Sequence, residues 1–89
     1  MEKPWYVYIL RCGDGTLYTG ITDDVSARLQ AHRDGKGAKY TRGRGPLELV
    51  YQEASENHSA AAKREWQIKQ LKKQDKLELC RIWAQCSDE

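Results

Sequence analysis

Three apolar stretches of the chain have the length and composition of β-strands. Residues 5–12 (WYVYILRC) are aromatic and β-branched on both alternating faces, which is typical of a central strand covered on both sides. Residues 16–21 (TLYTGI) have the composition of a strand that returns beside the first. Residues 47–54 (LELVYQEA), directly after Pro46, predict a third strand.

Other segments have the pattern of amphipathic helices. The first helix is expected over residues 23–32, with Asp23 and Asp24 in its first turn, where acidic side chains are favourable. The second is expected to begin at Asn57 or Ser59, because either side chain can cap it.

A break near Lys72–Lys73 separates the second helix from a third. The resulting order, β-β-α-β-α-α, predicts an α+β fold: a small, mainly antiparallel three-stranded sheet flanked by helices. We expect residues 1–89 to form a single domain. The apolar stretches are too short to span a bilayer, so no contact with a membrane is expected.

The turn between the first two strands decides which residues share a face. A three-residue loop, Gly13-Asp14-Gly15, is expected, because glycine at its third place accepts the left-handed conformation. In that register Leu10 faces Tyr18 and Tyr8 faces Gly20. Opposed residues point to the same side, so Tyr8 and Tyr18 would be diagonal neighbours on one face. A two-residue loop would place them on opposite faces.

Two interpretations of Tyr8 and Tyr18 remain open at this point. Tyrosine is a good strand residue, and both rings could serve sheet packing. Gly20 favours a second interpretation, because glycine within a strand often marks a close approach and here leaves an open space beside a phenol. The tyrosines would then face something that reacts.

The first helix carries an arginine and a histidine on one side. Arg28 and His32 are four residues apart, so their side chains lie one above the other, flanking the buried stripe expected from Val25 and Leu29. Packed on the hairpin, the helix could hold both over the tyrosines, where a cation and a proton-transfer group suit phosphate chemistry. The alternative is an ordinary exposed pair.

Glu65 stands at the edge of the apolar stripe of the second helix, near Ala61 and Ile68. A carboxylate there is costly unless it is paired or binds a cation. Lys69, four residues later, offers a helical ion pair. One carboxylate with waters and substrate oxygens is also a normal setting for Mg²⁺.

Composition narrows the class of protein. The chain has 39% hydrophobic and 31% charged residues, which is typical of a globular domain. Its three cysteines do not suit a disulfide framework, and its two histidines do not complete a zinc site. We therefore expect a reducing, cytoplasmic environment.

The net charge is only +2, but the cations are clustered. Residues 35–47 (GKGAKYTRGRGPL), named the basic loop here, contain no acid, and residues 63–76 hold a second cluster. Such clusters suit a polyanion such as nucleic acid, or they are solvated surface. The candidate nucleic-acid contacts in the basic loop are Lys36, Lys39, Tyr40, Arg42 and Arg44.

In their order and spacing, these motifs resemble the GIY-YIG endonuclease superfamily, and most closely its small single-domain bacterial members. The resemblance runs from about Trp5 to Leu79 and includes the stretches YTGIT, GKGAKYTR and LELVY. The family's signature and site positions fall on Tyr6-Val7-Tyr8, Tyr18-Thr19-Gly20, Arg28, His32 and Glu65.

The resemblance implies a metal-dependent endonuclease that hydrolyses phosphodiester bonds in nucleic acid, with DNA expected ahead of RNA, and a role in DNA repair. Tyr8 would be the general base, directly or through His32, and Tyr18 would position the water or phosphate. Arg28 would stabilise charge on the phosphate, and Glu65 would hold Mg²⁺ or Mn²⁺. A free phenol has a pKa of about 10 and is a poor base at neutral pH. Only nearby cations could lower the pKa of Tyr8, and Arg28 and the metal are the candidates. No small-molecule cofactor is implied, and a monomer is expected.

Three positions depart from the family pattern. Tyr6 replaces the glycine of the first signature, Ile21 stands where some repair nucleases carry a lysine, and no asparagine follows Asn57. Two alternatives therefore accompany the nuclease hypothesis. One is a nucleic-acid-binding module of the same fold that has lost turnover, and the other is an interaction domain whose basic loop contacts an acidic protein.

Overall fold

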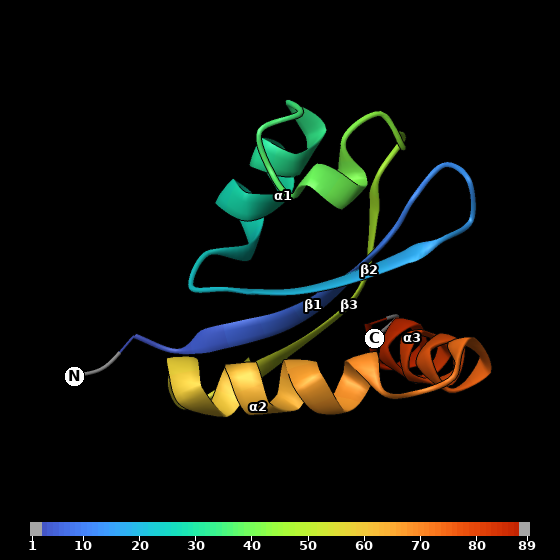
Figure 1. Cartoon of the computed structure of the whole chain (residues 1–89). Helices are drawn as coiled ribbons and strands as arrows, with labels where there is room; N and C mark the ends of the chain where they lie inside the picture. Colours follow the sequence, from blue (N-terminus) through green and yellow to red (C-terminus); the bar gives the residue numbers. More distant parts are fainter. Residues whose placement is uncertain (1–2, 88–89) are drawn as a thin grey trace.

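The computed structural model describes residues 3–87 and shows a three-stranded sheet between two layers of helices (Figure 1). The predicted α+β class and the order β-β-α-β-α-α are confirmed. A short 3₁₀ helix in the basic loop, η1, was not predicted. The elements are β1 (Trp5–Arg11), β2 (Leu17–Thr22), α1 (Val25–Arg33), η1 (Lys39–Thr41), β3 (Glu48–Ser55), α2 (His58–Lys69) and α3 (Lys73–Ser87).

The strands lie in the order β2-β1-β3, and both pairings are antiparallel, so β1 is central as predicted. Gly15 has a φ of 85°, the left-handed conformation that the three-residue hairpin loop requires. This loop sets Leu10 opposite Tyr18 and Tyr8 opposite Gly20, which confirms the predicted register.

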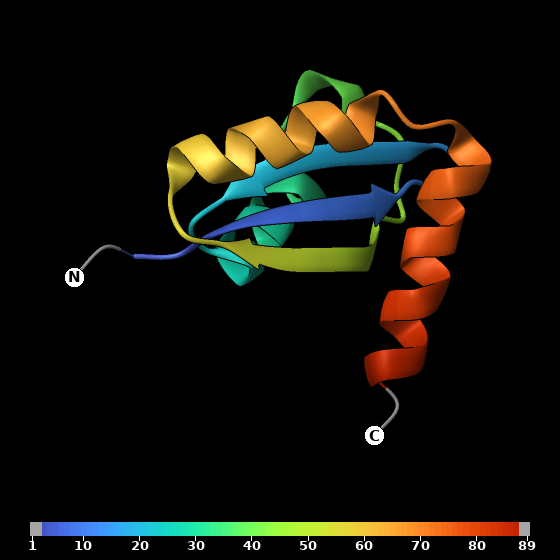
Figure 2. The same cartoon turned by 90° about the horizontal axis from the view of Figure 1, so that it is seen from below.

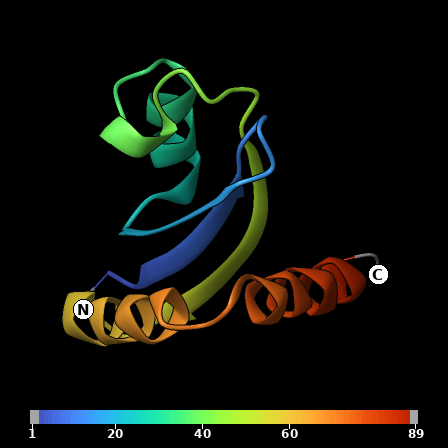
Figure 3. The same ribbon diagram turned by 45° about the vertical axis from the view of Figure 1, so that its right-hand side comes forward.

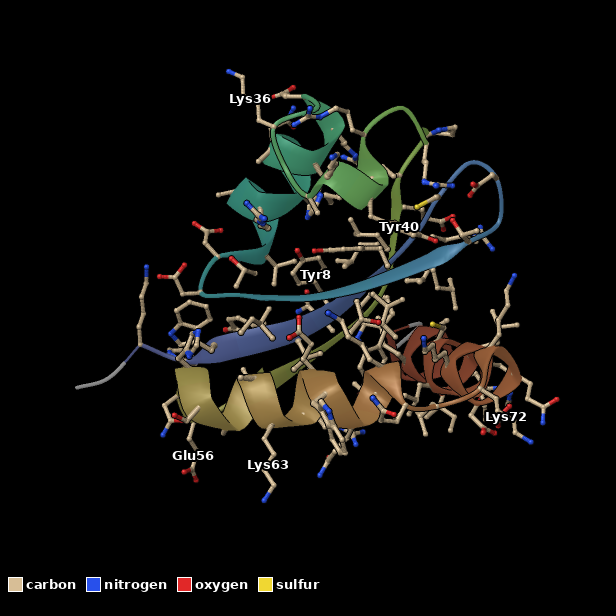
Figure 4. All side chains as sticks on the ribbon, in the orientation of Figure 1. Tyr8, Lys36, Tyr40, Glu56, Lys63 and Lys72 are labelled. Atoms are coloured by element: carbon tan, nitrogen blue, oxygen red, sulfur yellow. The ribbon has the colours of Figure 1, made fainter. Side chains whose placement is uncertain are left out.

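The two faces of β1 are covered by different elements. Val7 and Ile9 form an apolar core with Ala61 and Ile68 of α2. Tyr8 points the other way, toward α1 and the basic loop (Figure 4). Figure 2 shows α2 running along β2, with α3 crossing the end of the sheet. The central strand is thus buried on both sides, as its composition indicates.

The start of α1 differs from the prediction by one or two residues. Asp24 is the cap, and its carboxylate accepts a hydrogen bond from the Ala27 amide at 3.1 Å. Asp23 precedes the helix, so the expected acidic first turn is absent. The cause is the Thr22 hydroxyl, which accepts from the Asp24 amide at 3.1 Å and extends the turn before the helix begins.

The buried residue of α1 also differs from the prediction. Val25 and Leu29 are only half-buried and line an open hollow beside Tyr6, whereas His32 is buried. The basic loop folds back over the C-terminal turn of α1 and covers His32 instead. Hydrophobic spacing alone could not reveal this, because the cover comes from a loop.

The helices of the second layer begin and end close to the predicted residues. Asn57 caps α2, which decides between the two predicted starts. Helix α2 ends at Lys69 and α3 begins at Lys73, so the break is confirmed. None of the helices within the described residues is long and apolar enough to cross a membrane. Cys12 and Cys80 are free thiols.

Candidate active site

Tyr8 and Tyr18 lie on the same face of the hairpin. Tyr8 lies between the sheet and α1 (Figure 4). Their ring centroids are 6.3 Å apart. Gly20 allows this arrangement, because a Cβ atom there would lie 2.6 Å from the Tyr8 hydroxyl oxygen and 3.1 Å from the Tyr18 ring. The space expected to be open beside the phenol is therefore occupied by the phenol of Tyr8 itself.

His32 is held between β1 and the basic loop. Its Nε2 atom is 2.8 Å from the Tyr8 hydroxyl, and its Nδ1 atom is 2.8 Å from the Thr41 hydroxyl. The Ala38 amide also faces Nδ1, at 3.3 Å. A Cβ atom on Gly37 would collide with the imidazole ring, so glycine permits the close approach of the loop. Both ring nitrogens have polar partners, which offsets the cost of burying the imidazole.

The protons around His32 can be arranged in two ways. Thr41 can donate to the Ala38 carbonyl, 3.0 Å away; Nδ1–H of His32 then donates to Thr41, and the bare Nε2 accepts the proton of Tyr8. In this arrangement the Ala38 amide gives up its bond to Nδ1. In the opposite tautomer, Thr41 and the Ala38 amide donate to Nδ1, and Nε2–H donates to the Tyr8 oxygen. Either way, the hydrogen bonds of His32 connect the basic loop to Tyr8.

Burial sets the acidity of this pair. It raises the pKa of Tyr8 to about 12, and the charges of Tyr18 and Glu65 act in the same direction. The Arg28 guanidinium lowers that pKa, but by less, so the lowering expected from Arg28 is outweighed. Arg28 thus acts on the Tyr8 pKa in the expected direction, but the degree of burial, which the sequence does not show, has the larger effect. Burial, together with the charge of Arg28, lowers the pKa of His32, which keeps the imidazole neutral at pH 7.

Glu65 lies where the sequence predicts, on α2 between the fully buried residues Ala61 and Ile68. Its carboxylate is 3.5 Å from the Lys69 ammonium group, and its negative charge contributes to the raised pKa of Tyr8. No group of three or more His, Cys, Asp or Glu side chains that could hold a metal occurs within residues 3–87. One carboxylate is nevertheless a suitable donor for Mg²⁺, which keeps several waters and takes phosphate oxygens from its substrate.

The basic loop folds over the tyrosines. Tyr40 stacks on Tyr18, with ring centroids 5.9 Å apart and an interplanar angle of 27°. Arg44 lies over the Tyr40 ring, 4.6 Å from its centroid, and its guanidinium is 2.6 Å from the Asp14 carboxylate of the hairpin loop. Arg44 is therefore engaged within the protein, although it was predicted as a nucleic-acid contact. The remaining cations of the loop are exposed and form no ion pair with another described residue: Lys36, Lys39 and Arg42.

Sequence reasoning missed the contribution of Thr41, Ala38 and Gly37 to the site. All three lie in the motif GKGAKYTR, which was interpreted only through its charges and Tyr40. A glycine-rich loop has no period from which a contact with α1 could be predicted. The one available signal was Gly37, because a glycine can mark the close approach of two segments.

The chain matches a family model described as "GIY-YIG catalytic domain" over residues 4–78. It therefore belongs to the GIY-YIG family. Among known proteins, it is 52% identical over 85 residues to a UPF0213 protein of Oceanobacillus iheyensis, covering 96% of this chain and 99% of that one. It is 55% identical over 74 residues to a UPF0213 protein of Clostridium perfringens, covering 83% and 80% of the two chains.

Two solved structures share the fold. The solution NMR structure of a UPF0213 protein from Bacillus halodurans is 47% identical, with a TM-score of 0.57, and the match covers 89% of this chain and 84% of that one. The solution NMR structure of a protein from E. faecalis is 38% identical, with a TM-score of 0.60 and coverage of 91% and 88%. The likeness to these small bacterial proteins confirms the predicted fold class.

Proposed function

We propose that this chain is a metal-dependent endonuclease that hydrolyses phosphodiester bonds in nucleic acid, with DNA as the expected substrate. The observation that carries the proposal is the hydrogen bond of 2.8 Å between the Tyr8 hydroxyl and Nε2 of the buried His32. The charges of Arg28 and Glu65 act on the same phenol. Membership of the GIY-YIG family supports the class of reaction.

The proton path follows from the raised pKa of Tyr8. A phenol with a pKa of about 12 is protonated at pH 7 and is not a preformed base. As water attacks phosphorus, the Tyr8 oxygen takes a proton from the water and passes its own proton to the neutral Nε2 of His32. Thr41 accepts Nδ1–H and stabilises the imidazolium that forms. The bond from phosphorus to the leaving oxygen breaks, and that oxygen keeps the electron pair and is protonated by solvent.

Other side chains would handle charge rather than protons. Arg28 would stabilise the negative charge that grows on the phosphate oxygens, and Tyr18 would position the water or the phosphate. Glu65 would hold Mg²⁺ or Mn²⁺, which supplies Lewis-acid stabilisation of the leaving oxygen when bound.

The basic loop would bind the nucleic-acid backbone beside this site. Its exposed cations suit phosphate contacts, and Tyr40 offers a ring for a base. Arg44 would act indirectly, by holding Tyr40 in place from its ion pair with Asp14. Because one copy of the chain supplies every group in this scheme, we propose that residues 1–89 act as one domain and as a monomer.

The test is incubation with single-stranded, duplex and branched DNA and RNA, with Mg²⁺, Mn²⁺ or EDTA. The parent protein should cleave only with a metal. Glu65→Gln should abolish cleavage and keep nucleic-acid affinity within a few-fold, since affinity comes mostly from phosphate contacts. Glu56→Gln is the matched control, because Glu56 is exposed and points away from the sheet (Figure 4). Full activity of Glu65→Gln would refute the role of this carboxylate.

A binding module without turnover is the second candidate function. The ion pair of Glu65 with Lys69 and the absence of an asparagine after Asn57 favour it. It predicts nucleic-acid binding in EDTA and no cleavage of any substrate with either metal. Absence of any salt-dependent binding would instead favour the protein-interaction domain.

A further inference from the structure

The edge strand of the sheet, β2, lies between the basic loop and the α2–α3 connection (Figure 3). A second cationic surface lies along it. Two hollows of about 260 and 210 Å³ lie there and share Leu17, Tyr40 and Lys76 in their linings. Because they share these residues, the two hollows are adjacent, and together they are called the groove here. Lys69 lines the larger hollow and Lys73 the smaller.

The lining of the groove is strongly positive. Three lysines line it, and neither hollow is lined by an acidic residue. Within the part of the chain that the structure describes, no carboxylate pairs with Lys73 or Lys76, and Lys69 pairs only with Glu65. Such a lining attracts an anionic ligand.

A buried hydroxyl in the same wall also indicates a polar ligand. Thr19 lines the larger hollow and is 4% exposed, and its hydroxyl has no hydrogen-bond partner in the described residues. Buried polar groups are normally paired, so an unpaired one needs an explanation. A ligand that fills the groove could supply the missing partner.

The mixture of flat apolar surface and cations identifies the kind of nucleic acid. Tyr40 is 42% exposed and shares the lining with Leu17. Tyr18 stacks on its ring and Arg44 lies over it, so only part of the ring is open to a ligand. A duplex keeps its bases stacked inside and offers only phosphates to such a surface, whereas an unpaired strand offers both a base for the ring and phosphates for the lysines. The groove therefore suits an unpaired strand.

We infer that this groove binds an unpaired stretch of DNA or RNA next to the phosphate that is cut, with a base against the exposed part of Tyr40 and phosphates on Lys69, Lys73 and Lys76. The inference rests on the proposed nuclease function for its position in the reaction. Lys69 connects the two sites, because its partner is Glu65, the carboxylate proposed for the metal. A cation bound at Glu65 would release Lys69 for a phosphate oxygen.

The experiment measures binding without cleavage, in EDTA, by fluorescence anisotropy over a range of salt concentrations. The probes are an unstructured DNA strand, the RNA strand of the same sequence, and a DNA duplex of equal length. Lys73→Ala with Lys76→Ala is compared with Lys63→Ala and Lys72→Ala, which remove the same charge outside the groove lining. Figure 4 shows Lys63 pointing away from the sheet.

The groove variant should lower the salt slope for the unpaired strand by about 1.4, at about 0.7 for each lost contact, and the control pair should leave it unchanged. With the DNA duplex, the groove variant and the control variant should have equal effects on binding. Tyr40→Leu should weaken binding of the unpaired strand roughly 5- to 150-fold through the lost stacking, while Tyr40→Phe, which keeps the ring, should bind like the parent. If these results are obtained with the DNA strand or with the RNA strand, they support the inference and identify which of the two the groove binds.

Two results would overturn the inference: equal effects of the two lysine pairs on both single strands, or an equal loss of duplex and single-strand binding in the groove variant. These outcomes are separate from the fate of the proposed function. A parent protein that binds single strands as expected but cleaves nothing would remove the nuclease and leave the groove. The parent protein could instead cleave with metal while the two lysine double variants have equal effects on single-strand binding. That result would keep the nuclease and remove the groove.

Discussion

The two faces of β1 are held by different kinds of interaction, although they come from alternating residues of one strand. Toward α2, Ile9 and its neighbours meet Ile68 in an apolar cluster. Toward α1, Tyr8 meets His32 through a hydrogen bond, and His32 in turn meets Thr41. Each face is buried, so the difference lies in chemistry and not in exposure.

This difference predicts how each face responds to change. Hydrophobic contacts have no direction, so the α2 face should respond to the volume of its side chains. Hydrogen bonds join particular atoms, so the α1 face should respond to the loss of one oxygen with almost no change in volume. Substitutions in the apolar cluster of the α2 face should therefore alter stability alone, whereas those in the polar network of the α1 face should also alter chemistry.

The largest expected effect is on the rate, from Tyr8→Phe. This change removes one hydroxyl and keeps the packing of the ring, so we expect cleavage to fall about 10²- to 10⁴-fold, as for loss of a general base. Circular dichroism should show an intact fold. Tyr51→Phe is the matched control, since Tyr51 is on β3, packs against the α2-face core, and gives its hydroxyl to Glu53. An unchanged cleavage rate in Tyr8→Phe would indicate that Tyr8 serves only to pack the sheet.

The next largest effect is on stability, from Ile68→Ala on the apolar face. Ile68 is fully buried, so the cavity should lower the free energy of unfolding by about 2–5 kcal/mol. Urea denaturation measures it. Cleavage per folded molecule should stay close to that of the parent, because the polar network is on the other face. A loss of rate as large as that of Tyr8→Phe would show that the two faces are not independent.

A smaller effect is expected from Thr41→Val. Valine has the shape of threonine but no oxygen, so Nδ1 of His32 loses its hydroxyl partner and keeps only the Ala38 amide, 3.3 Å away. The free energy of unfolding should therefore fall by about 1–3 kcal/mol. Nitrogen NMR of the imidazole should show a changed balance of the two tautomers. Thr41→Ser keeps the oxygen and should restore the parent spectrum. The same spectrum in all three proteins would exclude Thr41 as the group that sets the tautomer.

The smallest effect is the dependence of stability on pH. Because the pKa of His32 is lowered on folding, the unfolded chain binds more protons below about pH 6.5, and stability should fall as the pH falls through this value. The slope for one proton is at most about 1.4 kcal/mol per pH unit. Because the pKa of Tyr8 is raised to about 12, stability should also fall above about pH 10.

Denaturation at several pH values tests the predicted loss of stability at acid pH, called the acid limb here. His32→Gln should flatten it, whereas His58→Gln should not, because His58 is exposed at the start of α2. If stability falls equally steeply with pH in both variants, titratable groups other than His32 cause the fall.

The same comparison explains what the sequence could predict. The hairpin loop and the strand pattern were sufficient for the register, and hence for Tyr8 and Tyr18 sharing a face, because both depend on neighbours along the chain. The position of Glu65 followed from the helical period. The burial of His32 by Thr41 could not be predicted, since the two residues belong to segments without a common period. The raised pKa of Tyr8 depends on the burial of its own side chain, which the sequence could not show either.

The connection between the hairpin and the basic loop has a consequence for the entropy of binding. The Gly13 amide donates to the Arg44 carbonyl at 2.6 Å, and Asp14 holds the Arg44 side chain. A glycine-rich loop loses much conformational freedom when a ligand orders it, and this loss subtracts from affinity. Here the folded hairpin has already ordered the loop before any ligand arrives. The hairpin tip thus preorganises the surface beside the site without contacting the ligand itself.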